Sequence, residues 1–452
     1  MKKLKPVFLL ILSLIMIGLT GCRFPLGPPP NRAKQNQERG TPPAEVKAVK
    51  ATPDSAIAED SNPTNPTTES ELQPSNNSYP IVDTSQITCY DNRKAIICSE
   101  AGTTFYGQDA QYNGLQPSYT DNGDGTITDL NTGLMWQKTP DLDHKSTHDQ
   151  AIAGVASFNL AGYNDWRLPS IKELYSLTDF RGSSMNKTPY INTTYFDFVF
   201  GDWSKGERTI DAQYWSSNIY LGTVFGRGET AIFGVNFADG RIKGYGLRPN
   251  LSMRQFVRYV RGNPAYGLND FVDNGDSTIT DQATGLIWMK TDSGTTMNWA
   301  DSLSYCENLE YAGQTDWRLP NVKELQSIVN YDRAPDAQNP DQQGPAIDPI
   351  FGLTEVESWF WSSTTLLEAP PHLGVGAHGA YVTFGQAFGV KYGSLINVHG
   401  AGAQRSDPKS GNPNDWSGGF GPQGDQIRIY NYARCTICRY VCPAHRRRCF
   451  TC

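Results

Sequence analysis

The sequence is poor in charge. Charged residues make up 19% of its 452 residues, below the roughly 25% of an average protein. The net charge is −7 and no long basic stripe is present, so nucleic acid is not an expected partner. Glycine has no every-third-residue period, which excludes collagen. Ala, Glu, Lys and Leu do not dominate, which excludes a long coiled coil.

Enzyme signatures are also missing. No Gly-x-Ser-x-Gly elbow, His-Glu-x-x-His pair or phosphate loop occurs, and only six histidines are present. We therefore expect no catalytic residue, cofactor or metal, and no enzyme. What the sequence does have is 11% aromatic residues among many turn-forming residues. This combination is typical of short strands joined by loops, not of a chain that is disordered throughout.

The N-terminus predicts export. Three lysines precede an apolar run over about 7–19, which is too short to span a bilayer comfortably and fits a secretory signal over 1–21. Leu19-Thr20-Gly21-Cys22 resembles a bacterial lipobox, and an uncleaved signal anchor is the alternative. The resemblance implies that Cys22 carries lipid and anchors the protein in a membrane. Arg23 after that cysteine favours the bacterial outer membrane, with exposure on the cell surface left open.

A tether and a leader follow the signal. Residues 22–80 hold 11 of the 29 prolines and little that could form a core, so we expect a disordered tether. Residues 81–114 are a leader in which Cys89 and Cys98 flank eight residues. We expect these two cysteines to bridge a hairpin, because disulfides persist in exported proteins.

The rest of the chain contains an internal repeat. Asp121-Asn-Gly-Asp recurs at Asp273, Gly-Leu-Met-Trp136 recurs as Gly-Leu-Ile-Trp288, and Asp165-Trp-Arg-Leu-Pro recurs at Asp316. A Lys-Glu-Leu follows each of the last pair, and Trp-Ser-Ser recurs further on. The spacing of about 150 residues indicates two whole domains, over 115–262 and 263–435, before a Cys- and Arg-rich tail over 436–452.

Each repeat predicts the same elements. Turn-forming segments suggest two hairpins, and two helices follow. Asn298 caps the first helix of the second repeat, and Ser170 with Glu173 and Asn321 with Glu324 have capping-box spacing at the second helices. The predicted fold is α+β, an antiparallel sheet with two helices in each domain. The repeated tryptophans are expected in the core, with Arg167 and Arg318 bonded to carbonyls or to Glu173 and Glu324. The Asn-Gly-Asp segment fits a turn better than a calcium loop.

These motifs resemble the family of the C-terminal domain of the Legionella collagen-like adhesin. The resemblance implies two tandem C-type-lectin-like domains on a bacterial surface protein, and the family's named member adheres to sulfated glycans. We therefore expect a surface-anchored lipoprotein whose domains bind an extracellular glycan or protein ligand, in an adhesion or matrix role. The alternative is a structural cell-envelope or filament-associated subunit.

The remaining cysteines differ between the two repeats. Cys306 and Cys435 occupy positions that are Val155 and Tyr259 in the first copy. Gain or loss of both together predicts a Cys306–Cys435 disulfide, and C-type lectins also tie their first helix to their last strand. A buried free thiol and an unrelated tail thiol are the alternative. For the tail, two small disulfides, a zinc site with His445, and a disordered tail all stay open.

Ligand-binding residues are expected where the copies differ, because repeated positions serve the fold. The loops before the final strands carry aromatic and polar side chains that suit sugar stacking. In the second repeat the candidates are Tyr392, His399, Arg405, Asp415 and Trp416, and in the first they are Tyr220, Arg227 and Glu229.

Overall fold

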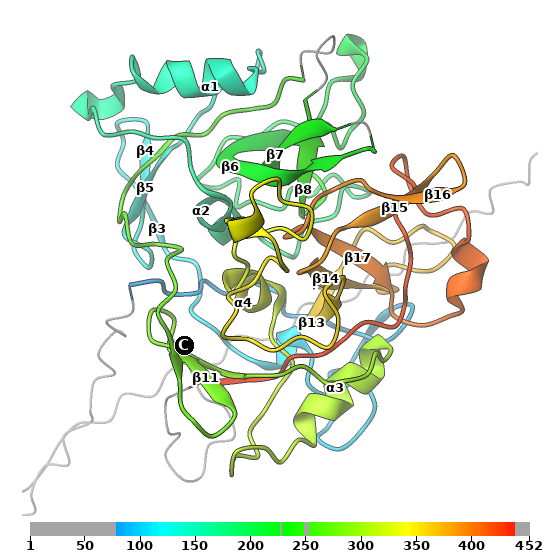
Figure 1. Ribbon diagram of the computed structural model, residues 1–452. Coiled ribbons are helices and arrows are strands. Elements are labelled where there is room, and N and C mark those ends of the chain that lie inside the picture. The colour runs from blue at the N-terminus through cyan, green and yellow to red at the C-terminus, as the bar shows by residue number, and fades with distance from the viewer. Residues whose placement is uncertain (1–77, 227, 248–252, 439–452) are drawn as a thin grey trace, which may run out of the picture. The chain divides into compact units, whose positions relative to one another are not determined.

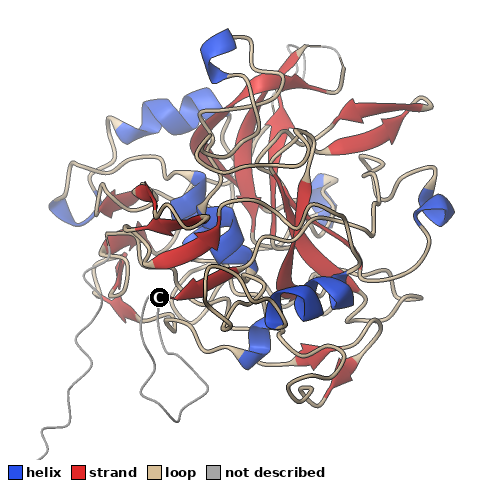
Figure 2. Cartoon of the chain, turned by 60° about the horizontal axis from the view of Figure 1, so that its bottom comes forward, coloured by secondary structure: helices blue, strands red, loops and turns tan. Residues whose placement is uncertain are grey.

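The computed structural model describes residues 78–226, 228–247 and 253–438. The expected signal, Cys22 and nearly all of the tether therefore lie outside the described residues, as do Arg227 and residues 439–452. In the described part of the chain no helix is both long and apolar enough to cross a membrane. Strands predominate over helices (Figure 2).

The two repeats contain the same elements in the same order. In repeat 1 they are β3 (Tyr119–Asp121), β4 (Thr126–Asp129), β5 (Leu134–Gln137), α1 (His148–Val155), α2 (Ile171–Ser176), β6 (Gln213–Val224), β7 (Glu229–Asn236), β8 (Arg241–Gly246) and β9 (Val260–Gly262). In repeat 2 they are β10 (Phe271–Asp273), β11 (Thr278–Asp281), β12 (Leu286–Met289), α3 (Trp299–Glu307), α4 (Val322–Ser327), β13 (Trp359–Leu366), β14 (His378–Thr383), β17 (Gln404–Pro408) and β18 (Thr436–Cys438). Repeat 2 adds the hairpin of β15 (Phe388–Lys391) and β16 (Ser394–Asn397) between β14 and β17.

Each repeat has its own small antiparallel sheet. Strands β3, β4, β5 and β9 form one, and β10, β11, β12 and β18 form the other. The last strand of each repeat therefore closes the sheet that its first strands open. Since β18 begins at Thr436, the first three residues of the predicted tail belong to the sheet of repeat 2.

The long strands of both repeats form one shared sheet, which the sequence did not predict. Its order is β13-β14-β17-β8-β7-β6, and β17 joins β8 at the antiparallel pair Gln404–Ile242. Helices α2 and α4 contact each other and pack on β7 and β14 (Figure 1). One core cluster contains Trp136 of repeat 1 and Trp288 of repeat 2. The repeats are therefore packed against each other and are not two structurally independent domains joined by a linker.

The local signals at the helix starts are confirmed. Ser170 with Glu173 and Asn321 with Glu324 form capping boxes, and the Asn298 side chain accepts from the Asp301 N–H. Arg318 donates to Glu324 at 2.6 and 2.7 Å, and Arg167 donates to Glu173 in the same way. Each pair ties the start of the second helix to the Trp-Arg-Leu-Pro segment before it.

Both expected disulfides are present. Cys89 bonds Cys98 across the hairpin of β1 (Cys89–Tyr90) and β2 (Ala95–Ile96), and Cys306 on α3 bonds Cys435 beside β18. Cys438 is also disulfide-bonded; the rest of the predicted tail, 439–452, lies outside the described residues, so the predictions for it are not tested.

The end of the predicted tether and the leader pack on the repeats. Tyr79 falls within the predicted tether but is buried: its backbone N–H donates to Ala283 O at 3.0 Å and its ring meets that of Tyr266 edge-on, both in repeat 2. In the leader, Thr84 O accepts from the backbone N–H of Phe180 in repeat 1 at 2.9 Å. The Gln86 side chain bonds both the N–H and the C=O of Thr365, at 2.9 and 2.8 Å. The leader therefore belongs to the folded unit.

Candidate functional site

Repeat 2 carries a protruding loop region that repeat 1 lacks. In repeat 1, residues 237–240 connect β7 directly to β8, whereas β14 and β17 are separated by the β15–β16 hairpin. The hairpin packs on segment 411–425, which includes a short 3-10 helix, η5 (Pro413–Trp416). The contacts are the hydrogen bond from Val390 N to Gly424 O (2.6 Å) and the antiparallel bridge Gly389–Asp425. We call the hairpin with segment 411–425 the loop lobe (Figure 1).

Three of the expected ligand-binding residues lie on the outer part of the loop lobe. Tyr392 sits in the turn of the hairpin with 92% of its surface exposed. Its φ of 53° and the Gly393 that follows make the tight turn that presents the ring. Asp415 is exposed on η5, and the ring of Trp416 meets that of Phe420 edge-on at 5.6 Å. The lobe thus presents the Tyr392 ring and the Asp415 carboxylate to solvent, while the Trp416 ring is half-buried.

His399 and Arg405 lie at the base of the loop lobe instead. Both are buried, and both donate to the Asp425 carboxylate: His399 Nε2 at 2.7 Å and Arg405 Nε at 3.1 Å, with a second bond from the guanidinium. Burial lowers the pKa of His399 to about 3, so its imidazole is neutral. Although burial opposes it, Arg405 and His399 hold the pKa of Asp425 well below its usual range. Asp425 stays charged and fixes segment 411–425 to the shared sheet.

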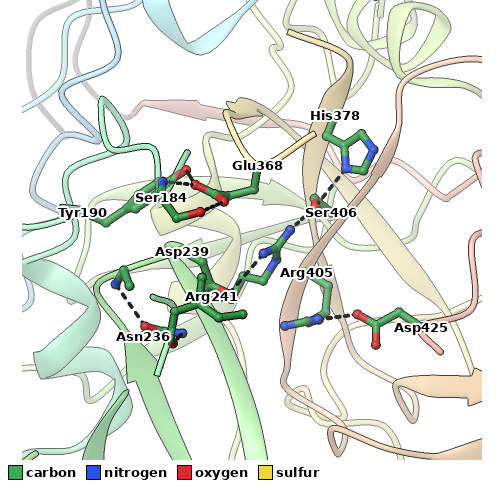
Figure 3. Close-up of polar contacts among 12 residues, drawn as sticks. Ser184, Tyr190, Asn236, Asp239, Arg241, Glu368, His378, Arg405, Ser406 and Asp425 are labelled. Carbon is green, nitrogen blue, oxygen red and sulfur yellow. Dashed lines mark hydrogen bonds and ion pairs between the residues drawn. The ribbon is translucent and has the colours of Figure 1, made fainter. Parts of the chain in front are cut away.

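A second group of polar contacts, around Arg241, crosses the junction of the repeats near the Arg405–Asp425 pair (Figure 3). Its guanidinium donates to Asp239 at 3.1 Å and to Ser406 Oγ at 3.2 Å, and Ser406 Oγ lies 3.2 Å from His378 Nδ1. Buried atoms on Asp239, Arg241, His378 and His399 have no partner among the described residues. The junction between β8 and β17 is therefore polar, while the core around it is apolar.

The candidates in repeat 1 have a different setting. Tyr220 is buried, donates to Asp336 of repeat 2 and accepts from Asn397 Nδ2 at 3.0 Å. It therefore connects the two repeats. Glu229 is half-buried at the start of β7, and Arg227 lies outside the described residues.

A pocket of about 210 Å³ lies elsewhere in repeat 1. The leader, β3 and the end of α2 line it, with Tyr119, Asp179, Arg181 and Asn192 among its residues. No sequence pattern indicates this pocket, because the leader residues that line one side are far along the chain from the residues of α2 and the loop after it.

The acidic side chains of the described residues differ in arrangement from the ligand sets that metal ions need. No group of three or more His, Cys, Asp or Glu side chains in the described part is arranged to hold a metal ion. The carboxylates of the Asn-Gly-Asp turn bond the turn itself: Asp121 accepts from Gly123 N at 3.0 Å, and Asp124 from Thr126 N at 3.0 Å and its Oγ1 at 2.6 Å. This supports the interpretation of the segment as a turn.

A family model described as the Lcl C-terminal domain matches residues 125–261 and 277–394. Together the two matches cover more than half of the chain. The chain belongs to the Lcl C-terminal domain family. No curated protein and no solved structure matches it. The second Lcl C-terminal domain match stops at the first residue of β16. Segment 411–425 of the loop lobe, with Trp416, therefore lies beyond the matched residues, as do His399 and Arg405 at its base.

The loop lobe also depends on a residue that the sequence did not single out. Asp425 stands in a Gly-rich stretch, and its two partners lie 20 and 26 positions away. A lone acidic residue among glycines was a usable signal, but nothing in the sequence identified Arg405 and His399 as its partners.

Proposed function

We propose that this protein is an adhesin-like lipoprotein of the bacterial surface that binds an extracellular glycan or protein through the loop lobe. Its lipid anchor would be Cys22 in the outer membrane, and its two repeats would be C-type-lectin-like. Membership of the Lcl C-terminal domain family supports a surface role. The carrying observation is that Tyr392 is 92% exposed on a lobe whose base is held by the buried Asp425.

The lobe has the physical features of a binding surface. Aromatic rings supply large contact area at small entropic cost, and exposed ones gain most when a ligand covers them. A rigid base reduces the ordering cost of binding. Asp425 supplies that rigidity because Arg405 and His399 are both committed to it.

The proposed mode of action is binding and not catalysis. His399, which lies at the base of the lobe, is buried and its Nε2 donates to Asp425. It is therefore not presented to a ligand as a catalytic group would be. With a net charge of −7 nucleic acid is not a proposed ligand.

The test is binding of the full chain to a glycan array and to host-cell matrix proteins. Tyr392→Ala and Trp416→Ala are each expected to weaken the binding affinity at least tenfold while leaving the thermal melting temperature unchanged. Tyr430→Ala is the matched control, because Tyr430 is also exposed but lies outside the lobe. Loss of binding in the control alone would contradict the assignment.

A second experiment separates the alternative of a structural envelope subunit. Protease shaving of intact cells should remove the repeats if they face outward. Protection from protease, no glycan binding and stable co-purification with envelope proteins would favour the structural role.

A further inference from the structure

Lys172 on α2 lies in a setting that the loop lobe does not use. Its Nζ donates to Asn269 Oδ1 at 2.7 Å and to Gly267 O at 3.0 Å, and it lies 5.5 Å from the centre of the Tyr79 ring. Both acceptors are neutral. Gly267 has a φ of +90°, and its missing side chain leaves room for the lysine stem. The amine of repeat 1 is therefore packed against the segment that opens repeat 2.

Asn269 is held from its other side by a carboxylate. Its Nδ2 donates to Asp281 Oδ2 at 2.8 Å. Asp281 is fully buried, and its Oδ1 accepts from the backbone N–H groups of Asp270 and Ala283 at 2.9 and 3.1 Å. The side-chain amide thus lies between a nucleophile and a proton acceptor, both fixed by the fold.

We propose that Lys172 and Asn269 join in an intramolecular isopeptide bond, with Asp281 as the proton carrier. The Lys172 nitrogen attacks Cγ of Asn269, and the carbonyl electron pair moves to Oδ1. Asp281 takes a proton from the attacking nitrogen and gives it to Nδ2. The Cγ–Nδ2 bond breaks, ammonia leaves and the carbonyl re-forms. One C–N bond forms and one breaks, with no oxidant, reductant or co-reactant.

The surroundings favour each requirement of this step. The amine must be unprotonated to attack, and burial lowers the pKa of Lys172 to about 7, so a large share is neutral near neutral pH. The hydrogen bond of 2.7 Å from Lys172 Nζ to Asn269 Oδ1 holds the amine against the amide group, so the attack on Cγ needs no bimolecular encounter. Lysine is the residue whose reactivity burial raises in this way.

The other repeat provides a natural comparison. Lys323 occupies the same place in its Lys-Glu-Leu motif, but its Nζ donates to two backbone carbonyls, of Asp83 and Ser176, each at 2.9 Å. Asp129 is the counterpart of Asp281, and Pro117 stands where repeat 2 has Asn269. The reactive trio therefore occurs at one of two equivalent places. The bond would connect α2 of repeat 1 covalently to the start of repeat 2. Such a link would resist separation of the repeats when a surface protein is under mechanical tension.

The experiment is mass spectrometry on the full chain after reduction, alkylation and trypsin digestion. The expected product is a branched peptide joining the Lys172 and Asn269 segments, lighter than the two peptides by one ammonia, with no cleavage after Lys172. Lys172→Arg and Asn269→Ala should abolish it. Asn269→Asp should give the same linkage with loss of water. Lys323→Arg is the matched control and should retain the linkage.

The refuting result is equally direct. If trypsin cleaves after Lys172 in the folded and then denatured wild-type protein, and the Asn269 peptide has its unmodified mass after prolonged incubation at pH 8, the bond does not form. A linked mass that persists in Lys172→Arg would also refute it, because another lysine would then be the nucleophile. Circular dichroism of each variant shows that it folds, so loss of the bond cannot be attributed to unfolding.

Discussion

Replacing Asp425 by alanine tests how the loop lobe is held. The side chains of Asp425, Arg405 and His399 are 13%, 11% and 2% exposed, so the substitution leaves a buried guanidinium without its carboxylate. Breaking a buried ion pair by removing one partner costs about 3–5 kcal/mol. The neutral His399 loses its acceptor as well, for which about 1 kcal/mol is typical. We therefore expect Asp425→Ala to lower the free energy of unfolding by about 4–6 kcal/mol.

The assay is urea unfolding followed by tryptophan fluorescence, together with limited proteolysis. Arg208 and Asp211 are the matched control, since this ion pair is 44% and 25% exposed. Asp211→Ala removes less than about 1 kcal/mol of pair energy. The proteolysis should show new cleavage in segment 411–425 of Asp425→Ala. An Asp425→Ala cost below about 1 kcal/mol, equal to that of the exposed pair, would refute the argument that burial makes this contact strong.

Three further outcomes follow from buried contacts. Replacing Cys306 and Cys435 together by serine should cost up to about 4–5 kcal/mol in the chain-entropy model, since the bridge spans 129 positions; a melting temperature unchanged by reduction would contradict this. Burial, with the nearby Asp83 charge, raises the pKa of Asp109 to about 7, so stability should fall as the pH rises from about 4 towards 7. Asp109→Asn should flatten this part of the melting-temperature curve, and an unchanged slope would argue against it. Tyr220→Phe leaves Asp336 with one donor fewer and should cost about 1–3 kcal/mol, measured by urea unfolding.

Local features of the fold were predictable because their causes are local. The capping boxes at Ser170 and Asn321 need residues only three positions apart. Comparison of the two copies revealed the Cys306–Cys435 pair, because a bridge requires both cysteines at once. The duplicated tryptophans, such as Trp136 and Trp288, were expected in the core because each copy needs a large side chain at the same place to fill its interior, and both are buried.

The shared sheet and the role of Asp425 were not predictable in this way. Strand β8 meets β17 through the single pair Gln404–Ile242. The alternation of residues in a strand predicts which face is buried, but it does not predict which other strand lies beside it. The five candidates in repeat 2 lie in or beside one loop region, but the differences between copies could not separate the exposed Tyr392 from the buried His399. That distinction depends on which side chains Asp425 reaches after the chain has folded.

The shared sheet puts the two copies in different structural settings. If each repeat were an independent module, both would need the same loops and the same cross-links. Repeat 1 instead joins β7 to β8 by residues 237–240, which brings β8 against β17 and places Arg241 beside Ser406. Repeat 2, supported by that contact, carries the inserted loop lobe and the Cys306–Cys435 bridge. The inserted hairpin and the bridge are therefore differences between the copies, so under the proposed function a ligand site is better sought by comparing the two copies within this chain than by treating them as duplicates.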